Sequence, residues 1–266
     1  MGPSTEIFTK VCSHAHQAAI LTSIQYLLEW DERTKMPSAG GAYRAEQAAY
    51  VAGLVHQKQT DPALGSWLGE LAASPLATDP TSDTGAVIRH LQHNYDKKTR
   101  LPQKLVEELT RTAVQGQQVW AAARKADDFS SFQPLLEKMV GLKQQEAAAL
   151  GYENDPYDAL LDDYEPGEST PRIAKVLADL RDALVPLVQA IGESPRRPDV
   201  GLLAREFPKS AQEAFGKQAA QAIGFDFQAG RLDVTDHPFC VETGPRDVRL
   251  TTRYDEHAFS DGFFSI

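Results

Sequence analysis

The side chains best suited to binding chemistry lie near the C-terminal end of the chain, in His237-Pro238-Phe239 and in the segment 247–255. This segment alternates in character with the period of a β-strand. One face of such a strand would carry Val248, Leu250, Thr252 and Tyr254, and the other Asp247, Arg249, Thr251, Arg253 and Asp255. A polar face of this kind is typical of a cleft wall, and equally of an ordinary half-solvated antiparallel strand.

Two histidines, His90 and His93, could face one metal ion, because side chains three residues apart lie on the same side of a helix. No third ligand follows at a spacing typical of a metal site, so we expect the pair to be structural. The sequence also has no H-E-x-x-H, no P-loop, no G-x-G-x-x-G and no G-x-S-x-G motif. By themselves these residues name no reaction.

An acidic run without any Lys or Arg covers residues 153–168. Its carboxylates are Glu153, Asp155, Asp158, Asp162, Asp163, Glu165 and Glu168. The run could mark a cation site, although it lacks the ligand spacing of an EF-hand loop. Solvated helix ends and a turn at Pro166-Gly167 explain it more simply, and we prefer that interpretation.

The composition argues against several classes of partner. The 266 residues carry a net charge of -10 and no block of Lys and Arg, which disfavours nucleic acid. No apolar run approaches the roughly 20 residues of a membrane span, and the N-terminus lacks the pattern of a signal peptide. We therefore expect a cytoplasmic protein that binds neither nucleic acid nor membrane.

The hydrophobic pattern predicts a mainly α fold, an elongated multi-helix bundle that forms a single domain over residues 1–266. Helices are expected at 4–34, 42–59, 62–73, 84–98, 102–125, 130–150, 170–191 and 208–223. After Gly224 the period changes from helical to alternating, which predicts a small sheet of two or three antiparallel strands within 225–255.

Local signals add detail to several of these helices. Apolar residues of the first helix form a stripe that includes Val11, Ala18 and Ile24, and the many alanines of this helix predict close helix–helix packing. The second helix carries Ala45, Ala48, Ala49, Ala52 and Val55. Asp83 is expected to cap the helix at 84–98, and Ser130 or Ser131 to cap the helix at 130–150. In the helices at 102–125 and 130–150, the residues expected to face the core are Leu105, Leu109, Ala113, Gly116, Trp120, Leu135, Leu136, Met139, Val140, Leu142 and Leu150.

The His237-Pro238-Phe239 and Asp247-x-Arg249-x-Thr251 motifs resemble those of the Taq-type thermostable metallocarboxypeptidases. Earlier segments agree with this family at 28–31, 34, 36–37, 40–41, 44–47 and 156–167. The last of these reads Pro-Tyr-Asp-Ala-Leu-Leu-Asp-Asp-Tyr-Glu-Pro-Gly. Either tripeptide alone would be a weak signal, but four blocks in the same order make the resemblance specific, and it extends along essentially the whole chain.

The resemblance implies a saddle-shaped, largely helical homodimer with a deep groove, which removes single residues from peptide C-termini. It implies a zinc-like divalent metal bound by an H-E-x-x-H helix and a later Glu, and peptide substrates. It also makes His237, Asp247, Arg249 and Thr251 candidates for substrate binding. The arginine fork could hold a carboxylate through two parallel bonds. The alternative, that these residues lock the sheet to the helices through buried hydrogen bonds, stays open.

The sequence departs from the family at its end. The family places H-E-x-x-H within a few residues of Ile266, so residues 256–266 are expected to begin a truncated zinc helix with Phe259, Phe263 and Phe264 on its apolar stripe. Ile266 continues that stripe. We expect apolar residues left uncovered there to favour self-association.

This chain is thus expected to contribute no catalytic residue, no metal ligand and no bound cofactor of its own, and to fold without hydrolysing peptides. The zinc or similar divalent metal belongs to the full-length family. The alternative function is a non-catalytic helical scaffold or peptide-binding module derived from that family.

Overall fold

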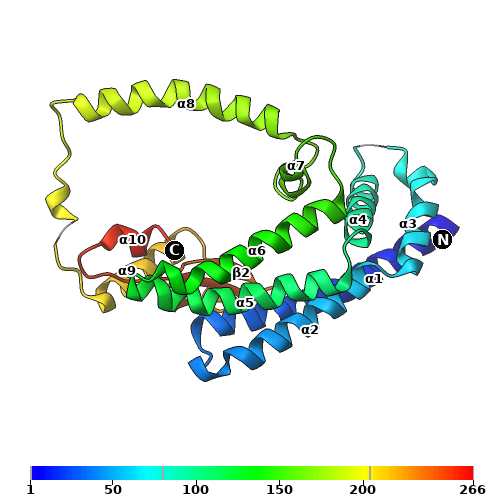
Figure 1. The fold of residues 1–266 in the computed structure, drawn as a ribbon, viewed down its shortest axis with the longest axis horizontal. Coiled ribbons are helices and arrows are strands. Elements are labelled where there is room, and N and C mark those ends of the chain that lie inside the picture. Colours follow the sequence, from blue (N-terminus) through cyan, green and yellow to red (C-terminus); the bar gives the residue numbers. More distant parts are fainter. Residues whose placement is uncertain (1, 80, 204, 266) are drawn as a thin grey trace.

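The structure, a computed structural model, describes residues 2–79, 81–203 and 205–265. Ten α-helices and three strands are described in this part of the chain (Figure 1). The helices are α1 (Pro3–Thr34), α2 (Gly41–Gln59), α3 (Pro62–Ala72), α4 (Asp83–Thr99), α5 (Gln103–Ala126), α6 (Phe129–Leu150), α7 (Pro156–Leu161), α8 (Thr170–Glu193), α9 (Lys209–Ala222) and α10 (Phe259–Phe263). The strands are β1 (Gly230–Val234), β2 (Cys240–Glu242) and β3 (Val248–Thr252). The mainly α prediction is confirmed.

Helix α2 packs closely against α1 and α5 because its inward face is built from small residues. The four alanines singled out from the sequence are all buried, as is Val55: Ala45, Ala48, Ala49, Ala52. At Gly53 a Cβ atom would lie 2.6 Å from Oε1 of Glu107 on α5, so a larger residue there would displace the Glu107 side chain. The buried alanines let α2 lie close to both neighbouring helices.

A hydrophobic cluster joins α1, α3 and α4 near the N-terminal end. Its buried members are Val11, Leu64, Leu68, Leu71 and Ile88. The predicted stripe on α1 holds for Val11 and Ala18 but is wrong for Ile24, whose exposed fraction is 44%. That part of α1 borders an open cavity of about 760 Å³ that it shares with α4 and β2, so the helix lacks a covering layer there.

The inward faces predicted for α5 and α6 are only partly buried. Leu142 and Leu150 are in the core, whereas Leu136 and Val140 are exposed. Two helix caps also lie one to three residues earlier than expected: Ser82, not Asp83, accepts from Gly85 N, and Asp128, not Ser130 or Ser131, accepts from Ser131 N. In both cases a side chain just before the helix reaches the free amides of its first turn.

The sheet has the order β1-β3-β2 and is mixed rather than antiparallel. Strand β2 pairs antiparallel with β3, but β1 pairs parallel with it. The prediction of a purely antiparallel sheet is therefore wrong. The physical reason is that residues 235–247 form a crossover connection that contains β2, and parallel strands need a connection of about this length.

Strand β3 is central in this sheet and is covered on both faces. Leu250 is buried on one face and Thr251 is fully buried on the other. The predicted half-solvated polar face therefore does not extend to Thr251. A central strand pairs along both edges and packs on both sides, which a period of two alone does not reveal.

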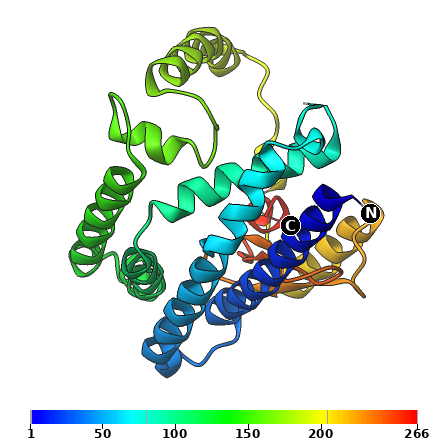
Figure 2. The same ribbon diagram turned by 90° about the vertical axis from the view of Figure 1, so that its right-hand side faces the viewer.

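Helix α8 carries an apolar face that nothing in the described part of the chain covers. Its 24 residues include no buried one. Figures 1 and 2 show it lying apart from the other helices. Its exposed apolar residues are Val176, Leu177, Leu180, Leu184, Val185, Leu187, Val188 and Ile191. No helix in the described ranges is both long enough and apolar enough to cross a membrane.

The C-terminal aromatic residues are less exposed than expected. Phe263 stacks on Phe259 with ring centres 5.5 Å apart, and both pack against Phe215 of α9. Phe264 is 84% exposed, and Ile266 lies outside the described residues. The larger uncovered apolar surface belongs to α8.

Charged substitutions on α8 are therefore expected to lower association without lowering stability. The double variant Leu180→Glu, Leu184→Glu should bind less of an apolar-sensing fluorescent dye and self-associate less, because both side chains are exposed. Dye fluorescence and sedimentation measure the two effects, and the thermal unfolding midpoint should change little. Gln189→Glu, an exposed polar position of the same helix, is the control. Equal dye binding by all three proteins would contradict the expectation.

Candidate functional site

Two arginines hold the sheet against the end of α1 at Trp30. Arg231 of β1 and Arg249 of β3 are register partners in the parallel pair. Their guanidinium carbons lie 4.9 Å and 4.3 Å from the centre of the Trp30 ring. Trp30 is only 5% exposed, so both cation–π contacts are largely removed from water.

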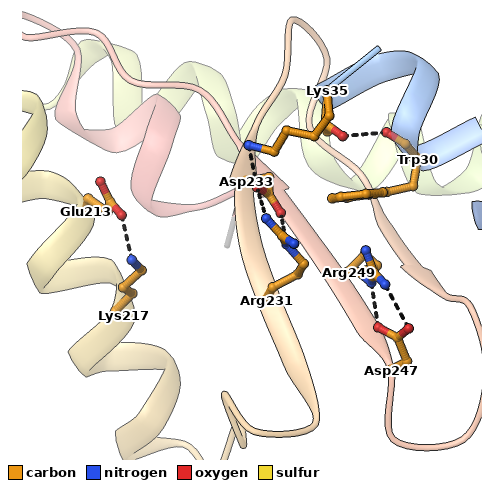
Figure 3. A network of polar contacts seen from close by, with 9 residues as sticks. Trp30, Lys35, Glu213, Lys217, Arg231, Asp233, Asp247 and Arg249 are labelled. Atoms are coloured by element: carbon orange, nitrogen blue, oxygen red, sulfur yellow. Dashed lines mark hydrogen bonds and ion pairs between the residues drawn. The ribbon is translucent and has the colours of Figure 1, made fainter.

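Each of these arginines forms a bidentate ion pair with a carboxylate two residues away in the chain (Figure 3). Arg249 donates from Nε and Nη2 to Asp247 at 2.5 and 2.8 Å, and Arg231 donates in the same way to Asp233 at 2.6 and 2.8 Å. Lys35 adds a third bond to Asp233 at 2.9 Å. Paired carboxylates offset the repulsion of two cations that share one ring.

The acidities of the two carboxylates reflect these pairs. Hydrogen bonds from Arg249 lower the pKa of Asp247 below its ordinary value. Burial alone would raise the pKa of Asp233, but hydrogen bonds from Arg231 and Lys35 outweigh it, so the pKa of Asp233 is also lowered. Both groups are thus charged at neutral pH. The fork of Arg249 is 13% exposed and is already engaged by Asp247.

Thr251 fixes the His237-Pro238-Phe239 segment to β3. Its hydroxyl accepts from Phe239 N at 2.6 Å and donates to Phe239 O at 2.7 Å. Its own amide donates to the same carbonyl at 2.9 Å. Arg33 of α1 lies over the Phe239 ring at 5.0 Å. These contacts favour the locking role for Thr251 that the sequence left open.

His237 is the predicted residue that faces an open cavity. Its exposed ring meets Trp120 of α5 edge-on, with ring centres 6.2 Å apart. It lines an apolar cavity of about 340 Å³ between α5 and α6, together with Trp120, Phe132, Leu135, Leu136 and Met139. The structure therefore joins His237 to Thr251 through Phe239, while Asp247 and Arg249 lie at the contact with Trp30.

A second cavity, of about 820 Å³, meets the first at Trp120. It is lined by Arg33, Arg124, Lys125 and Arg253, with Asp236 as its one carboxylate. No sequence signal singles out Arg124 and Lys125, because two basic residues in the last turn of a helix normally offset its dipole. Only the fold brings Arg124 and Lys125 to the same cavity as residues 234–236.

The histidine pair and the acidic run have structural partners. His93 lies 3.1 Å from Asp162, and Lys97 bonds to Asp162 and Asp163 at 2.9 and 2.8 Å. Asp158 accepts from Thr170 at the start of α8. Among residues 2–79, 81–203 and 205–265, no three His, Cys, Asp or Glu side chains form a group that could hold a metal ion.

Comparison with known proteins gives consistent matches over the length of the chain. The family model described as Carboxypeptidase Taq (M32) metallopeptidase matches residues 10–266. Thermostable carboxypeptidase 1 of Thermus thermophilus is 39% identical over 257 residues, covering 93% of this chain and 50% of that protein. Carboxypeptidase 1 of Bacillus subtilis is 32% identical, covering 90% and 47%.

Solved structures match in the same way. The BsuCP crystal structure superposes with a TM-score of 0.90 at 30% identity, covering 98% of this chain and 52% of that one. A Pyrococcus furiosus carboxypeptidase structure gives 0.80 at 28% identity, covering 100% and 52%. The chain thus spans about half the length of the relatives it matches.

Removing the Arg249 fork is expected to destabilise the fold in a pH-dependent way. Because the pKa of Asp247 is lowered from its ordinary 3.8 in the folded state, its stabilising effect is present above that value and is lost as the pH falls through the folded pKa. Arg249→Met should therefore lower the free energy of unfolding more at about pH 7 than at about pH 3. Urea unfolding at both pH values measures this. A deficit independent of pH would contradict the ion-pair contribution.

Thr251→Val should destabilise the chain by about 1–3 kcal/mol, because it leaves the partly buried amide of Phe239 without its acceptor. Thr99→Val, at an exposed position on α4, is the matched control. Denaturant unfolding compares the two variants. Equal losses would show that the hydroxyl of Thr251 is not what holds Phe239.

Proposed function

This chain belongs to the carboxypeptidase Taq (M32) metallopeptidase family, and we propose that it forms one wall of a groove that binds peptides at their C-terminal end. The observation that carries the proposal is the superposition on BsuCP, which covers 98% of this chain with a TM-score of 0.90. The cavities on either side of Trp120 provide an apolar and a cationic surface side by side. Such a combination suits a peptide, which offers apolar side chains and carboxylates together.

In this proposal the four candidate residues have different tasks. His237 contacts the peptide, since its ring is exposed at the apolar cavity. Thr251 positions His237 by holding the backbone of Phe239. Asp247 and Arg249 fix β3 to α1 at Trp30, so that the loop between β1 and β2 keeps its place.

The family implies a divalent metal, which when bound would polarise the scissile carbonyl or activate water. The described residues do not fit that metal, because they contain no group of three suitable ligands. We therefore derive no catalytic step for this chain. A non-catalytic helical scaffold or peptide-binding module derived from the family is the second candidate function. Homodimer formation, the zinc identity of the metal and a cytoplasmic location stay predictions.

The purified 266-residue chain is expected to bind a fluorescent peptide without releasing its C-terminal residue, with or without added Zn²⁺. Fluorescence anisotropy measures binding, and mass spectrometry of the peptide measures release. Zinc-dependent release by this chain would overturn the non-catalytic candidate. Absence of any peptide binding would overturn the proposed groove.

His237→Ala should weaken peptide binding by roughly 2–10-fold, the effect of losing one hydrogen bond or contact. The thermal unfolding midpoint should stay the same, because the side chain is exposed. His257→Ala removes another exposed histidine and serves as the control. If both variants bind equally well, His237 does not contact the peptide.

A further inference from the structure

A cationic cavity is an unusual feature in a chain whose net charge is -10. Four of its lining residues are basic: Arg33, Arg124, Lys125 and Arg253. Asp236 is its one acidic lining residue. Clustered charge of one sign at a concave surface raises the local concentration of ligands of the opposite sign. The charge of this cavity is thus opposite in sign to the net charge of the chain.

Several cations of this cavity have unused hydrogen-bonding capacity. Arg124 and Lys125 are exposed, and no ion pair joins either one to a carboxylate of the described residues. Arg253 lies 3.5 Å from Asp261, too far for a strong hydrogen bond. Arg33 uses one nitrogen on Glu29, while its buried Nε has no partner among the described groups.

Tyr254 also lines this cavity. Its hydroxyl is buried and has no hydrogen-bond partner among the described residues. Burial, with Glu213 as a smaller cause, raises the pKa of Tyr254 to about 12, so the hydroxyl keeps its proton at neutral pH. Buried polar groups normally have a partner, and one supplied by a ligand would satisfy this hydroxyl.

Trp120 connects this cavity to the apolar one. Trp120 lines both cavities. The guanidinium carbon of Arg124 lies 5.4 Å from the centre of its ring, and the ring of His237 contacts it edge-on. The cation–π contact orients Arg124 at the boundary between the two surfaces. A ligand that spans this boundary would place an apolar group against Phe132 and Met139 and an anionic group near Arg124.

We propose that this cationic cavity binds a carboxylate of the peptide, with Arg124 and Lys125 as its principal contacts and the neighbouring apolar side chain of the peptide in the adjoining cavity. The inference rests on the proposed peptide groove. The carboxylate has two possible sources in a peptide, an acidic side chain or the C-terminal α-carboxylate. Both offer two oxygen acceptors that match an arginine fork.

The test uses fluorescence anisotropy with the 266-residue chain and four labelled peptides of one length. All four have a Phe two residues before the C-terminus. They combine Glu or Gln beside the Phe with a free or an amidated C-terminus. The wild-type chain should bind the anionic form about tenfold more tightly than its neutral counterpart at low salt, which corresponds to one or two charge-assisted hydrogen bonds. The difference should shrink as salt is added.

The variant Arg124→Gln, Lys125→Gln should lose most of this preference while keeping its affinity for the neutral peptide. The charge-matched control is Lys10→Gln, Lys104→Gln, which removes two exposed lysines outside the cavity. A preference that depends on Glu assigns the site to an acidic side chain, and one that depends on amidation assigns it to the α-carboxylate.

Three outcomes would overturn the inference. If neutral and anionic peptides bind equally well, the cavity does not select carboxylates, although the peptide groove stands. If the preference persists in the Arg124→Gln, Lys125→Gln variant, or is lost equally in the control, another surface causes it. If no peptide binds at all, the proposed groove fails and this inference fails with it.

Discussion

The contact of two guanidinium groups with the ring of Trp30 is the interaction on which the C-terminal part of the fold depends. It joins the end of α1 to both parallel strands, since one arginine comes from β1 and the other from β3. The carboxylates of Asp233 and Asp247 make this arrangement possible by balancing the two charges. Without that junction, the strands would have only their own short ladder, and three short strands are marginal by themselves.

The position of the loop between β1 and β2 follows from this junction. Thr251 is two residues beyond Arg249 on the same strand face, and its hydroxyl holds Phe239. His237 is thereby placed against Trp120 of α5, where the apolar and cationic cavities meet. Relatives of this family are carboxypeptidases, which is why we interpret these cavities as a peptide-binding surface.

The sequence predicted what is local and left open what depends on distant pairing. The alanines of α2 recur with the period of a helix, and their burial could be read directly. The parallel pairing of β1 with β3 could not be predicted in this way, since it depends on the path of the connection between the two strands and not on the residue pattern within either one. Helix α8 has the same kind of apolar period as a buried helix, yet it is exposed, because periodicity shows which face is apolar and not what covers it. Motifs identified His237, whereas Arg124 became a candidate only through the folded position of Trp120.

The antiparallel packing of α2 on α5 ends before the C-terminal turns of α5. Gln103 bonds to Gln57 at one end of α2, and Gln118 reaches Gly41 at the other. Trp120, Arg124 and Lys125 therefore extend past the support that α2 provides, on a helix about 36 Å long. At that end the apolar cavity is bounded by α6 instead. The residues of α2 therefore fix where α5 lies without lining either cavity.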